Sequence, residues 1–401
     1  MPHSDSSLFA SIRASSPSSH SSGRIDGIDV LRGLSILAVI ILHINLRLRI
    51  ANTFGRHWPS FIVSDVGWNG DNGVIVFFAI SGFLITTMCL RRWKSLGEIS
   101  LARFYQLRFA RIAPMLLALL CALSVLHLFR VPYFTIRPQV STLPHALFAA
   151  LTFHINWLEA VHGYLPANWD VLWSLSNEEV FYLAFPLICL LMRRRAALIA
   201  TLCVFVVLGP FARTLLSHNP MWQDNGYLSC MDAIAIGCIA AMLSEKMILS
   251  ARLRSVLLWT GATLAIFGTM CKPLVLRAGI YRTGLDVTLL SFGVALMCLC
   301  FTQANQPGAI QWAWLRWFGR NSYEVYLTHM MVVFPILAIS RRLDPHSHWA
   351  PVSYVTMIFV SGAFGALIAR YFSDPLNKYL RRTRELARPK PATVEIPAVN
   401  D

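Results

Sequence analysis

The chain is organised as a series of long apolar segments separated by shorter polar connections. A run of about 20 predominantly apolar residues is long enough to cross the hydrocarbon core of a bilayer as a helix. Ten segments reach or approach this length: 28–46, 74–90, 109–129, 175–192, 196–216, 228–243, 256–271, 285–301, 322–339 and 352–372. The pattern predicts an all-α integral membrane protein, a bundle of about ten transmembrane helices.

An eleventh apolar segment, residues 143–158, is shorter and contains His145 and His154. If it crossed the membrane, the basic run 193–195 and the basic C-terminal segment would lie on opposite sides. With ten spans they share one side with Arg103, and that side carries twice as many Lys and Arg residues as the other. The positive-inside rule therefore makes 143–158 a re-entrant or interfacial helix at the outer face. It also predicts a multi-pass protein of the cell (inner) membrane with both termini in the cytoplasm.

Composition excludes several classes of protein. Of 401 residues, 56% are hydrophobic and 14% are charged, which argues against a soluble multidomain enzyme. The formal net charge of +15 is spread over short connections, so it indicates membrane topology and not a nucleic-acid partner. The nine cysteines lie in or beside apolar segments and form no CxxC pair. They are therefore interpreted as small apolar residues, which argues against a metal site or a disulfide framework.

The polar ends of the chain suggest three regions. Residues 1–23 are Ser-rich and lack the features of a signal peptide, so they are predicted to be a disordered cytoplasmic tail. Residues 24–375 form the transmembrane domain, and residues 376–401 form a basic cytoplasmic tail. The outer connections 47–73 and 130–174 are rich in aromatic residues, which favour an interfacial aromatic belt over platforms for stacking sugars.

The first apolar segment contains two ionisable residues, Arg32 and His43. Eleven residues make about three helical turns, so both side chains lie on one face, roughly 16 Å apart along the axis. Asp29 shares that face and can pair with Arg32. Snorkelling of Arg32 and a structural hydrogen bond of His43 are the alternatives. Because ionisable groups inside membranes are costly, the pair on one face favours a functional site.

Two arginines, Arg108 and Arg111, stand three residues apart where the third apolar segment begins on the inner side. They occupy adjacent turns of one helix face. Guanidinium groups at such a place suit a phosphorylated ligand. Anchoring of the helix end and affinity for anionic lipids explain the same residues, so spacing alone leaves both readings open.

The segment "WSLSNEEVFYLAFP" places two carboxylates at the outer entrance of an apolar segment. Ser176 and Glu179 fit a capping box, which gives Glu179 a structural explanation. Glu178 shares a helix face with Tyr182 and has no such explanation. We expect a cationic or histidine partner for it, and contact with His43 would orient the imidazole.

Weaker signals come from other polar residues within apolar segments. Ser81 and Gly82 are typical of close helix packing, whereas Asp232 and His329 could be structural hydrogen-bonding groups or part of a site. We assign supporting or substrate-binding roles to a set of six residues: Asp29, Ser81, Trp173, Tyr182, Asp232 and His329.

Five motifs occur in an order that resembles a known family. "IDVLRGLSILAVIILH", "GVIVFFAISGFLIT", "RFARIAP", "WSLSNEEVFY" and "SYEVYLTH" are similar to successive motifs of the acyltransferase-3 family of integral membrane O-acyltransferases. The first has the family's Arg, ten residues and then His, as Arg32 and His43. The resemblance extends over about residues 25–375.

The resemblance implies a ten-helix enzyme that moves an acyl group from cytoplasmic acyl-CoA, most simply acetyl-CoA, to a hydroxyl. The acceptor is expected to be an extracytoplasmic or envelope glycan. Acyl-CoA is then a donor substrate, and no permanently bound cofactor is expected. By resemblance, His43 is the catalytic base with Arg32 as its motif partner, Arg108 and Arg111 bind the donor, and Glu178 is the motif acid. We expect Arg32 to join Arg108 and Arg111 in holding the phosphates of the donor.

A transporter or flippase of a glycan or lipid-linked substrate would also place ionisable groups inside spans, and it is the alternative. The inner arginine pair and the lack of two similar halves favour the enzyme.

Overall fold

The computed structural model describes residues 25–93, 95–270, 275, 279–280, 283–303 and 312–386. The predicted N-terminal tail, Cys271 and residues 387–401 of the predicted C-terminal tail lie outside the described residues. Ten described helices are long and apolar enough to cross a membrane. They are α1 (Asp26–Asn45), α3 (Gly70–Trp93), α4 (Leu101–Leu128), α7 (Leu172–Leu191), α8 (Arg195–Leu215), α10 (Tyr227–Ser244), α11 (Ala251–Met270), α13 (Leu285–Thr302), α15 (Ser322–Leu343) and α16 (Ala350–Ile368).

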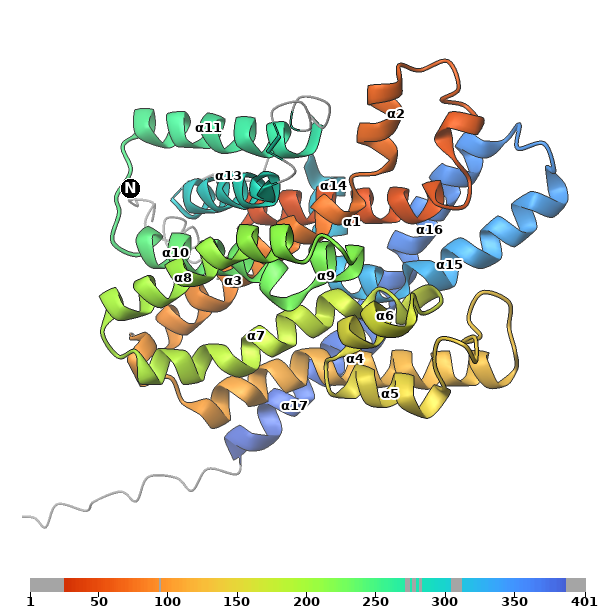
Figure 1. Ribbon diagram of the computed structural model, residues 1–401. Helices are drawn as coiled ribbons and strands as arrows, with labels where there is room; N and C mark the ends of the chain where they lie inside the picture. The colour runs from red at the N-terminus through yellow and green to blue at the C-terminus, as the bar shows by residue number, and fades with distance from the viewer. Residues whose placement is uncertain are drawn as a thin grey trace, which may run out of the picture.

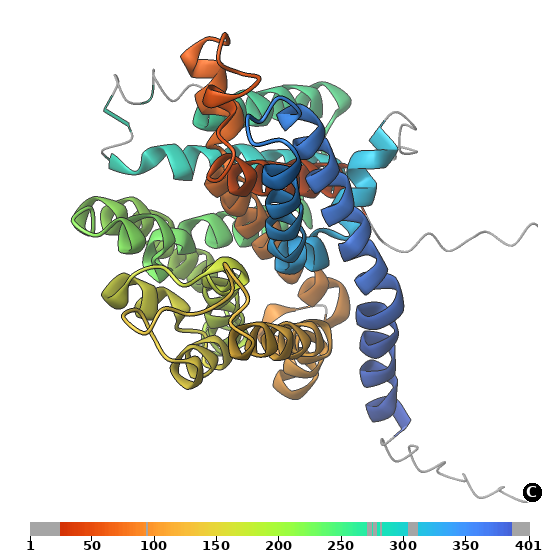
Figure 2. The ribbon, with the colours of Figure 1, turned by 90° about the vertical axis from the view of Figure 1, so that its right-hand side faces the viewer.

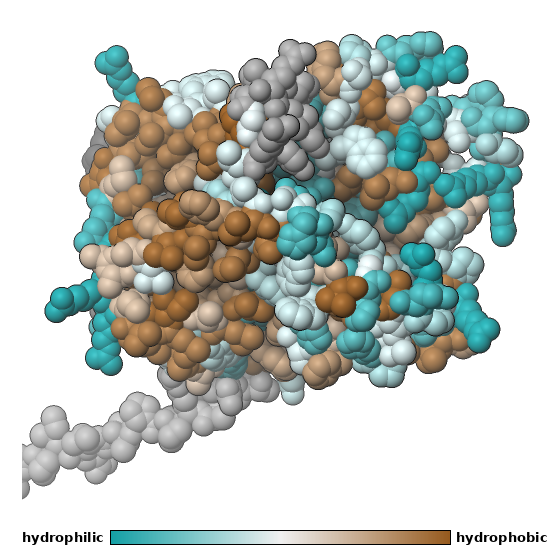
Figure 3. Space-filling model, viewed as in Figure 1, coloured by the Kyte–Doolittle hydropathy of each residue, from teal (hydrophilic) through white to brown (hydrophobic). Residues whose placement is uncertain are grey.

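Each long helix coincides with one predicted apolar segment to within a few residues or one to two turns, so the predicted all-α membrane fold is confirmed. The described chain contains no strand. Figure 1 views the bundle from the side, with most long helices running across the picture. Figure 3 shows apolar side chains gathered over the long helices at the left and centre, and hydrophilic residues toward the right-hand end, where α5, α6 and the α15–α16 connection lie.

Short helices fill the connections between the spans. They are α2 (Ser60–Gly67), α5 (Leu143–Leu151), α6 (Ile155–His162), α9 (Pro220–Asn225) and α14 (Ala313–Arg320), together with 3₁₀ turns at Ile50–Asn52, Leu96–Glu98 and Ala167–Trp169. The eleventh apolar segment thus forms two short helices, α5 and α6, separated by a turn in which Phe153 has a positive φ of 60°. Neither is long enough to span a bilayer, which agrees with the ten-span prediction.

The centre of the bundle depends on glycines that let helix backbones approach closely. A Cβ atom at Gly82 of α3 would overlap the carbonyl oxygen of Ile234 in α10, and one at Gly237 of α10 would overlap that of Ala79. Small residues at helix contacts are the usual way to pack membrane helices tightly. The close packing predicted around Gly82 is therefore present, and it fixes α3 beside α10.

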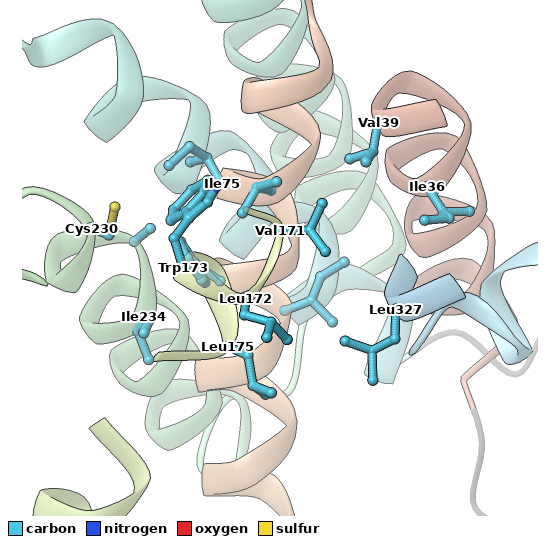
Figure 4. Packing of buried hydrophobic residues seen from close by; sticks show 14 of the residues in the cluster. Ile36, Val39, Ile75, Val171, Leu172, Trp173, Leu175, Cys230, Ile234 and Leu327 are labelled. Carbon is cyan, nitrogen blue, oxygen red and sulfur yellow. The ribbon is translucent and has the colours of Figure 1, made fainter. Parts of the chain in front are cut away.

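Trp173 is part of the buried apolar core and is 7% exposed. Its ring meets Phe78 edge-on at 6.0 Å between centroids. Figure 4 shows it among Ile75, Cys230 and Ile234, which come from α3 and α10. The structure thus gives Trp173 a packing role at the start of α7, and it does not line the cavity described below.

The chain stays helical after α16 and past residue 375, the predicted end of the transmembrane domain. A π-helical turn, Ala369–Ser373, joins α16 to a further helix, α17 (Asp374–Leu386). Figure 2 shows α16 and α17 as one continuous rod along the edge of the bundle. Helix α17 packs against α4, so its residues meet the arginines at the start of that helix.

Candidate active site

A cavity of about 460 Å³ lies between α1, α3, α4, α7, α15 and α17. Its volume is within the range of small-molecule sites. Five arginines from α1, α4, α14 and α17 line it: Arg32, Arg108, Arg111, Arg320 and Arg381. Arg32, Arg108 and Arg111 are the expected donor-binding arginines, and the structure brings them together. Arg320 and Arg381 were not predicted.

Arg32 enters the cavity from the first turns of α1. Its Nε donates to the Ser322 hydroxyl at the start of α15, at 3.1 Å. The Asp29 carboxylate interacts electrostatically with Arg32, as expected, but its close partner is Arg320, with Nε and Oδ2 3.3 Å apart. Arg32 is therefore held by one neutral hydrogen bond, which leaves guanidinium donors directed at the cavity.

Arg108 lies over the ring of Tyr182, with its guanidinium carbon 3.6 Å from the ring centroid. Its Nη2 is 3.5 Å from Oε1 of Glu179. A guanidinium on an aromatic face is stabilised by the ring quadrupole, so α7 fixes the direction of this arginine. Glu179 is therefore the ion-pair partner of Arg108 beside the cavity.

The predicted capping box is wrong because α7 begins at Leu172, with Val171 at the N-cap. Ser176 lies inside the helix, and its hydroxyl donates to the carbonyl of Leu172 at 3.0 Å. A 3₁₀ turn, Ala167–Trp169, precedes α7, and the helix begins three residues before the predicted apolar segment 175–192.

Arg111 forms the shortest ion pair among the arginines that line the cavity. Its Nη1 is 3.0 Å from Glu324 of α15 and 3.8 Å from Asp374 at the start of α17. The Tyr323 ring lies 5.0 Å from its guanidinium carbon. Glu324 is 1% exposed and was not predicted. Glu324 lies five residues before His329 in the motif "SYEVYLTH", and the sequence gives no sign of its ion pair because Arg111 is 213 residues away.

Glu178 also faces the cavity, and its Oε1 accepts a hydrogen bond of 2.6 Å from Ser81 of α3. Tyr182, its expected neighbour on the same face, lines the cavity beside it. The expected contact with His43 is not formed. Because α7 starts earlier than predicted, Glu178 lies in its second turn and points to the arginine-lined cavity.

His43 lies near the other end of α1 and contacts a second histidine. Its Nδ1 is 2.8 Å from the carbonyl oxygen of Val39. The ring meets His329 of α15 with centroids 4.9 Å apart at an interplanar angle of 66°. In His329, Nδ1 is 2.7 Å from the carbonyl oxygen of Tyr326. The two predicted histidines thus form a pair between α1 and α15.

Tyr326 connects the cavity to the histidine pair. It lines the cavity, and its ring centroid is 6.0 Å from that of His329. Its hydroxyl is 2.7 Å from the Ser174 hydroxyl and donates to the Val171 carbonyl at 3.1 Å. The only sequence signal for Tyr326 was its place three residues before His329, which puts both on neighbouring turns of α15.

Asp232 belongs to a different cluster. Its carboxylate receives Nη1 and Nη2 of Arg213 at 3.1 and 2.6 Å, and Thr288 donates to it at 2.6 Å. Arg213 also donates to the carbonyls of Gly284 and Ser229 and to Thr288. Both residues are almost fully buried, and neither lines the cavity. The structural reading of Asp232 is therefore the better one.

Beyond His43, the connection after α1 places Arg47 near the histidines. Its guanidinium carbon lies 5.1 Å from the ring centroid of Phe334, and burial lowers the pKa of Arg47 while Asp170 opposes that shift. On α6, burial raises the pKa of Glu159 well above its ordinary value, and its Oε1 accepts from the Leu165 backbone at 3.0 Å. At this end of the bundle, Arg341 adds a second guanidinium, which donates to the Arg47 carbonyl at 2.9 Å.

The sequence of the chain matches a known family. Residues 25–371 match the acyltransferase domain that defines it. The chain belongs to the acyltransferase-3 family. The resemblance inferred from the five motifs is thereby confirmed, and the chain has the multi-pass all-α membrane fold expected from it.

Similar proteins carry names from cell-wall modification. The chain is 25% identical over 377 residues to the putative peptidoglycan O-acetyltransferase YrhL of Bacillus subtilis, covering 88% of this chain and 55% of that protein. It is 24% identical over 379 residues to the O-acetyltransferase OatA of Staphylococcus aureus, covering 88% and 57%. A third relative, the peptidoglycan O-acetyltransferase OatA of Listeria monocytogenes, is 24% identical over 382 residues, covering 88% and 56%.

The chain thus spans little more than half the length of the curated relatives it matches. No solved structure matches the chain significantly.

Proposed function

We propose that this acyltransferase-3 protein moves an acyl group, most simply acetyl, from acyl-CoA on the inner side of the membrane to a hydroxyl of an envelope glycan. The observation that carries the proposal is the convergence of five arginines on one cavity in a member of this family. The names of its relatives support a glycan such as peptidoglycan as the acceptor.

The arginines that line the cavity support binding of a phosphorylated donor. Arginine is the preferred partner of phosphate because its planar guanidinium offers two parallel hydrogen bonds. The carboxylates that border Arg32, Arg108 and Arg111 are those of Asp29, Glu178, Glu179, Glu324 and Asp374, so the cavity is not uniformly positive. A phosphorylated donor such as acyl-CoA would compete with these carboxylates for Arg108 and Arg111.

The membrane topology supports donor binding on the cytoplasmic side and acyl transfer toward the outer face. Arg108 and Arg111 lie near the start of α4, beside the connection that carries Arg91 and Arg92. The positive-inside rule puts that connection in the cytoplasm. With ten spans the two termini share this side. His43, at the far end of α1, then lies toward the outer face, where a glycan hydroxyl can reach it.

The reaction is a nucleophilic acyl transfer with His43 as general base. The acceptor oxygen bonds to the acyl carbon while its proton passes to Nε2 of His43. The carbon–sulfur bond of the thioester breaks, and the CoA thiolate leaves and recovers that proton. The products are the ester and CoA-SH, so atoms and charge balance. General base catalysis of this kind contributes about 10²- to 10⁴-fold.

The test is acyl transfer by the purified protein in lipid nanodiscs, which expose both faces. Radiolabelled acetyl-CoA and peptidoglycan oligosaccharides are supplied, and label is counted in the saccharide. We expect transfer by the wild type and none by His43→Ala, while the exposed His346→Ala serves as a matched control with unchanged transfer. Near-normal transfer by His43→Ala would overturn the mechanism.

The same material tests the alternative function. Reconstituted into sealed liposomes, a transporter or flippase would move glycan across the bilayer without any acyl-CoA. Glycan movement without a donor, combined with absence of labelled ester, would replace the proposal by that alternative.

A further inference from the structure

The imidazoles of His43 and His329 have the same tautomer. Nδ1 of each ring faces a backbone carbonyl, that of Val39 at 2.8 Å and that of Tyr326 at 2.7 Å. A carbonyl oxygen can only accept, so Nδ1 must be the protonated nitrogen of both neutral rings. Each Nε2 therefore carries a lone pair and can only accept a proton or a hydrogen bond.

The Nε2 atom of His329 is buried and has no hydrogen-bond partner. The residue is 0% exposed. An unsatisfied buried polar group is destabilising by about 1–3 kcal/mol, so it calls for a reason beyond folding. A hydrophobic residue at this place in α15 would avoid that penalty.

The surroundings of His329 leave His43 as its partner. Tyr326 on its own helix uses its hydroxyl for Ser174 and Val171. Arg47, from the connection after α1, acts on His329 through its charge but makes no hydrogen bond to Nε2. No group of three or more His, Cys, Asp or Glu side chains suited to a metal ion occurs in the described part of the chain. The ring in edge-on contact is that of His43.

We propose that His329 is a positioning residue for His43. During acyl transfer His43 becomes an imidazolium, and the Nε2 lone pair of His329 accepts a hydrogen bond from it. The inference rests on the proposed function, in which His43 takes the acceptor proton. At that moment His43 has two N–H groups. Nδ1–H stays on the Val39 carbonyl, and the new Nε2–H needs an acceptor until the proton passes to the departing thiolate.

This arrangement gives His329 the role that sequence analysis offered to Glu178. A neutral histidine differs from a carboxylate because it does not hold the base permanently protonated. The base remains free to accept the hydroxyl proton, and the hydrogen bond to His329 forms only after proton transfer. Since both rings rest on rigid helices, the acceptor is placed before the reaction begins.

Two substitutions of His329 separate this role from simple packing. An Asn amide lies near the position of Nδ1, so His329→Asn can keep the bond to Tyr326 but offers nothing at Nε2. A Gln amide reaches the position of Nε2, so His329→Gln can offer an acceptor to His43. We expect kcat to fall about 10- to 100-fold in His329→Asn, the range for loss of one hydrogen bond to a charged group. His329→Gln should recover most of this loss.

The KM for acetyl-CoA should be unchanged in both variants, because His329 does not line the cavity. Equal kcat losses in both variants, or a kcat for His329→Asn equal to that of the wild type, would overturn the proposal. Each value is taken per mole of folded protein after size-exclusion chromatography.

A measurement on the unaltered chain covers the case in which a variant does not fold. In ¹⁵N-histidine-labelled protein, solid-state NMR should report His329 as protonated at Nδ1 and bare at Nε2. Protonation at Nε2 would contradict the inference even if acyl transfer is intact. Absence of any acyl transfer by the wild type would instead refute the proposed function, so the two failures are distinguishable.

Discussion

Arg213 and the arginines of the cavity both carry positive charge into the helix bundle, but their donors are used differently. The guanidinium of Arg213 has partners on every nitrogen: the Asp232 carboxylate, two backbone carbonyls and the Thr288 hydroxyl. Arg32 has one neutral partner, and Arg108 has a carboxylate at 3.5 Å and an aromatic face. The first cluster is saturated, and the second keeps donors available around a cavity.

This difference separates a structural charge from a functional one. A buried ion pair whose hydrogen bonds are all satisfied gains nothing from a ligand, and removing one partner leaves an uncompensated charge. Donors that line an open cavity can exchange their weak contacts for those of a ligand. Substitutions in the two clusters should therefore change different measured quantities.

The largest effect is expected for Arg213→Met, which leaves the Asp232 carboxylate buried without its partner. The free energy of unfolding should fall by about 3–5 kcal/mol. Thermal unfolding in detergent measures the loss, and the folded fraction should keep its KM for acetyl-CoA. Combining Arg213→Met with Asp232→Leu should restore part of the stability. A changed KM with unchanged stability would make Arg213 a functional residue.

The second effect concerns Arg108→Ala, which removes a donor of the cavity. The KM for acetyl-CoA should rise about 10- to 100-fold, corresponding to one charge-assisted contact, with little change in unfolding temperature. Arg91→Ala is the matched control because it removes the same charge from the same side outside the cavity. An unchanged KM in Arg108→Ala, or an equal rise in both variants, would return Arg108 to membrane anchoring.

A smaller effect is expected from the C-terminal helix. Arg381→Ala removes an exposed arginine that borders the cavity through α17, and its KM for acetyl-CoA should rise by only a few-fold, since exposed charges are screened. Arg382→Ala, the neighbouring exposed arginine that does not line the cavity, is the control. If both variants had the wild-type KM, α17 would not contribute to donor binding.

The smallest effect is expected for Ser81→Ala, which deletes the 2.6 Å hydrogen bond to Glu178. Acyl transfer should fall by less than about 10-fold, because a single hydrogen bond contributes about 0.5–1.5 kcal/mol and Glu178 stays in place beside Tyr182. Ser124→Ala is a suitable control because its hydroxyl bonds only within α4, to the Leu120 carbonyl. A loss comparable to that of His43→Ala would assign Ser81 to the chemistry itself.

Much of the fold could be predicted because a bilayer imposes a simple rule on sequence. Apolar segments of sufficient length gave all ten spans, and the distribution of basic residues correctly excluded 143–158. The helix starts were less predictable, because α7 begins in a buried polar stretch. The partner of Glu178 was also not predictable, because only the tertiary fold brings it to Ser81 of α3 and not to His43.

The candidate site was predictable where polar residues interrupt apolar segments. Arg32, Arg108, Arg111, Ser81 and Glu178 were found in this way and now line one cavity. Arg320 and Arg381 were missed because α14 and α17 are polar helices, in which an arginine carries no special signal. The pairing of Arg111 with Glu324 was missed because only the tertiary fold brings them together.

The central claim is that acyl groups enter at the arginine-lined cavity from the cytoplasm and leave on a hydroxyl at the other face. Membrane vesicles of both orientations, loaded with glycan acceptor, test it directly. Radiolabelled acetyl-CoA, which does not cross membranes, is added outside. We predict labelled glycan inside inside-out vesicles, none in right-side-out vesicles, and none with His43→Ala. Label in right-side-out vesicles, or in inside-out vesicles carrying His43→Ala, would contradict the claim.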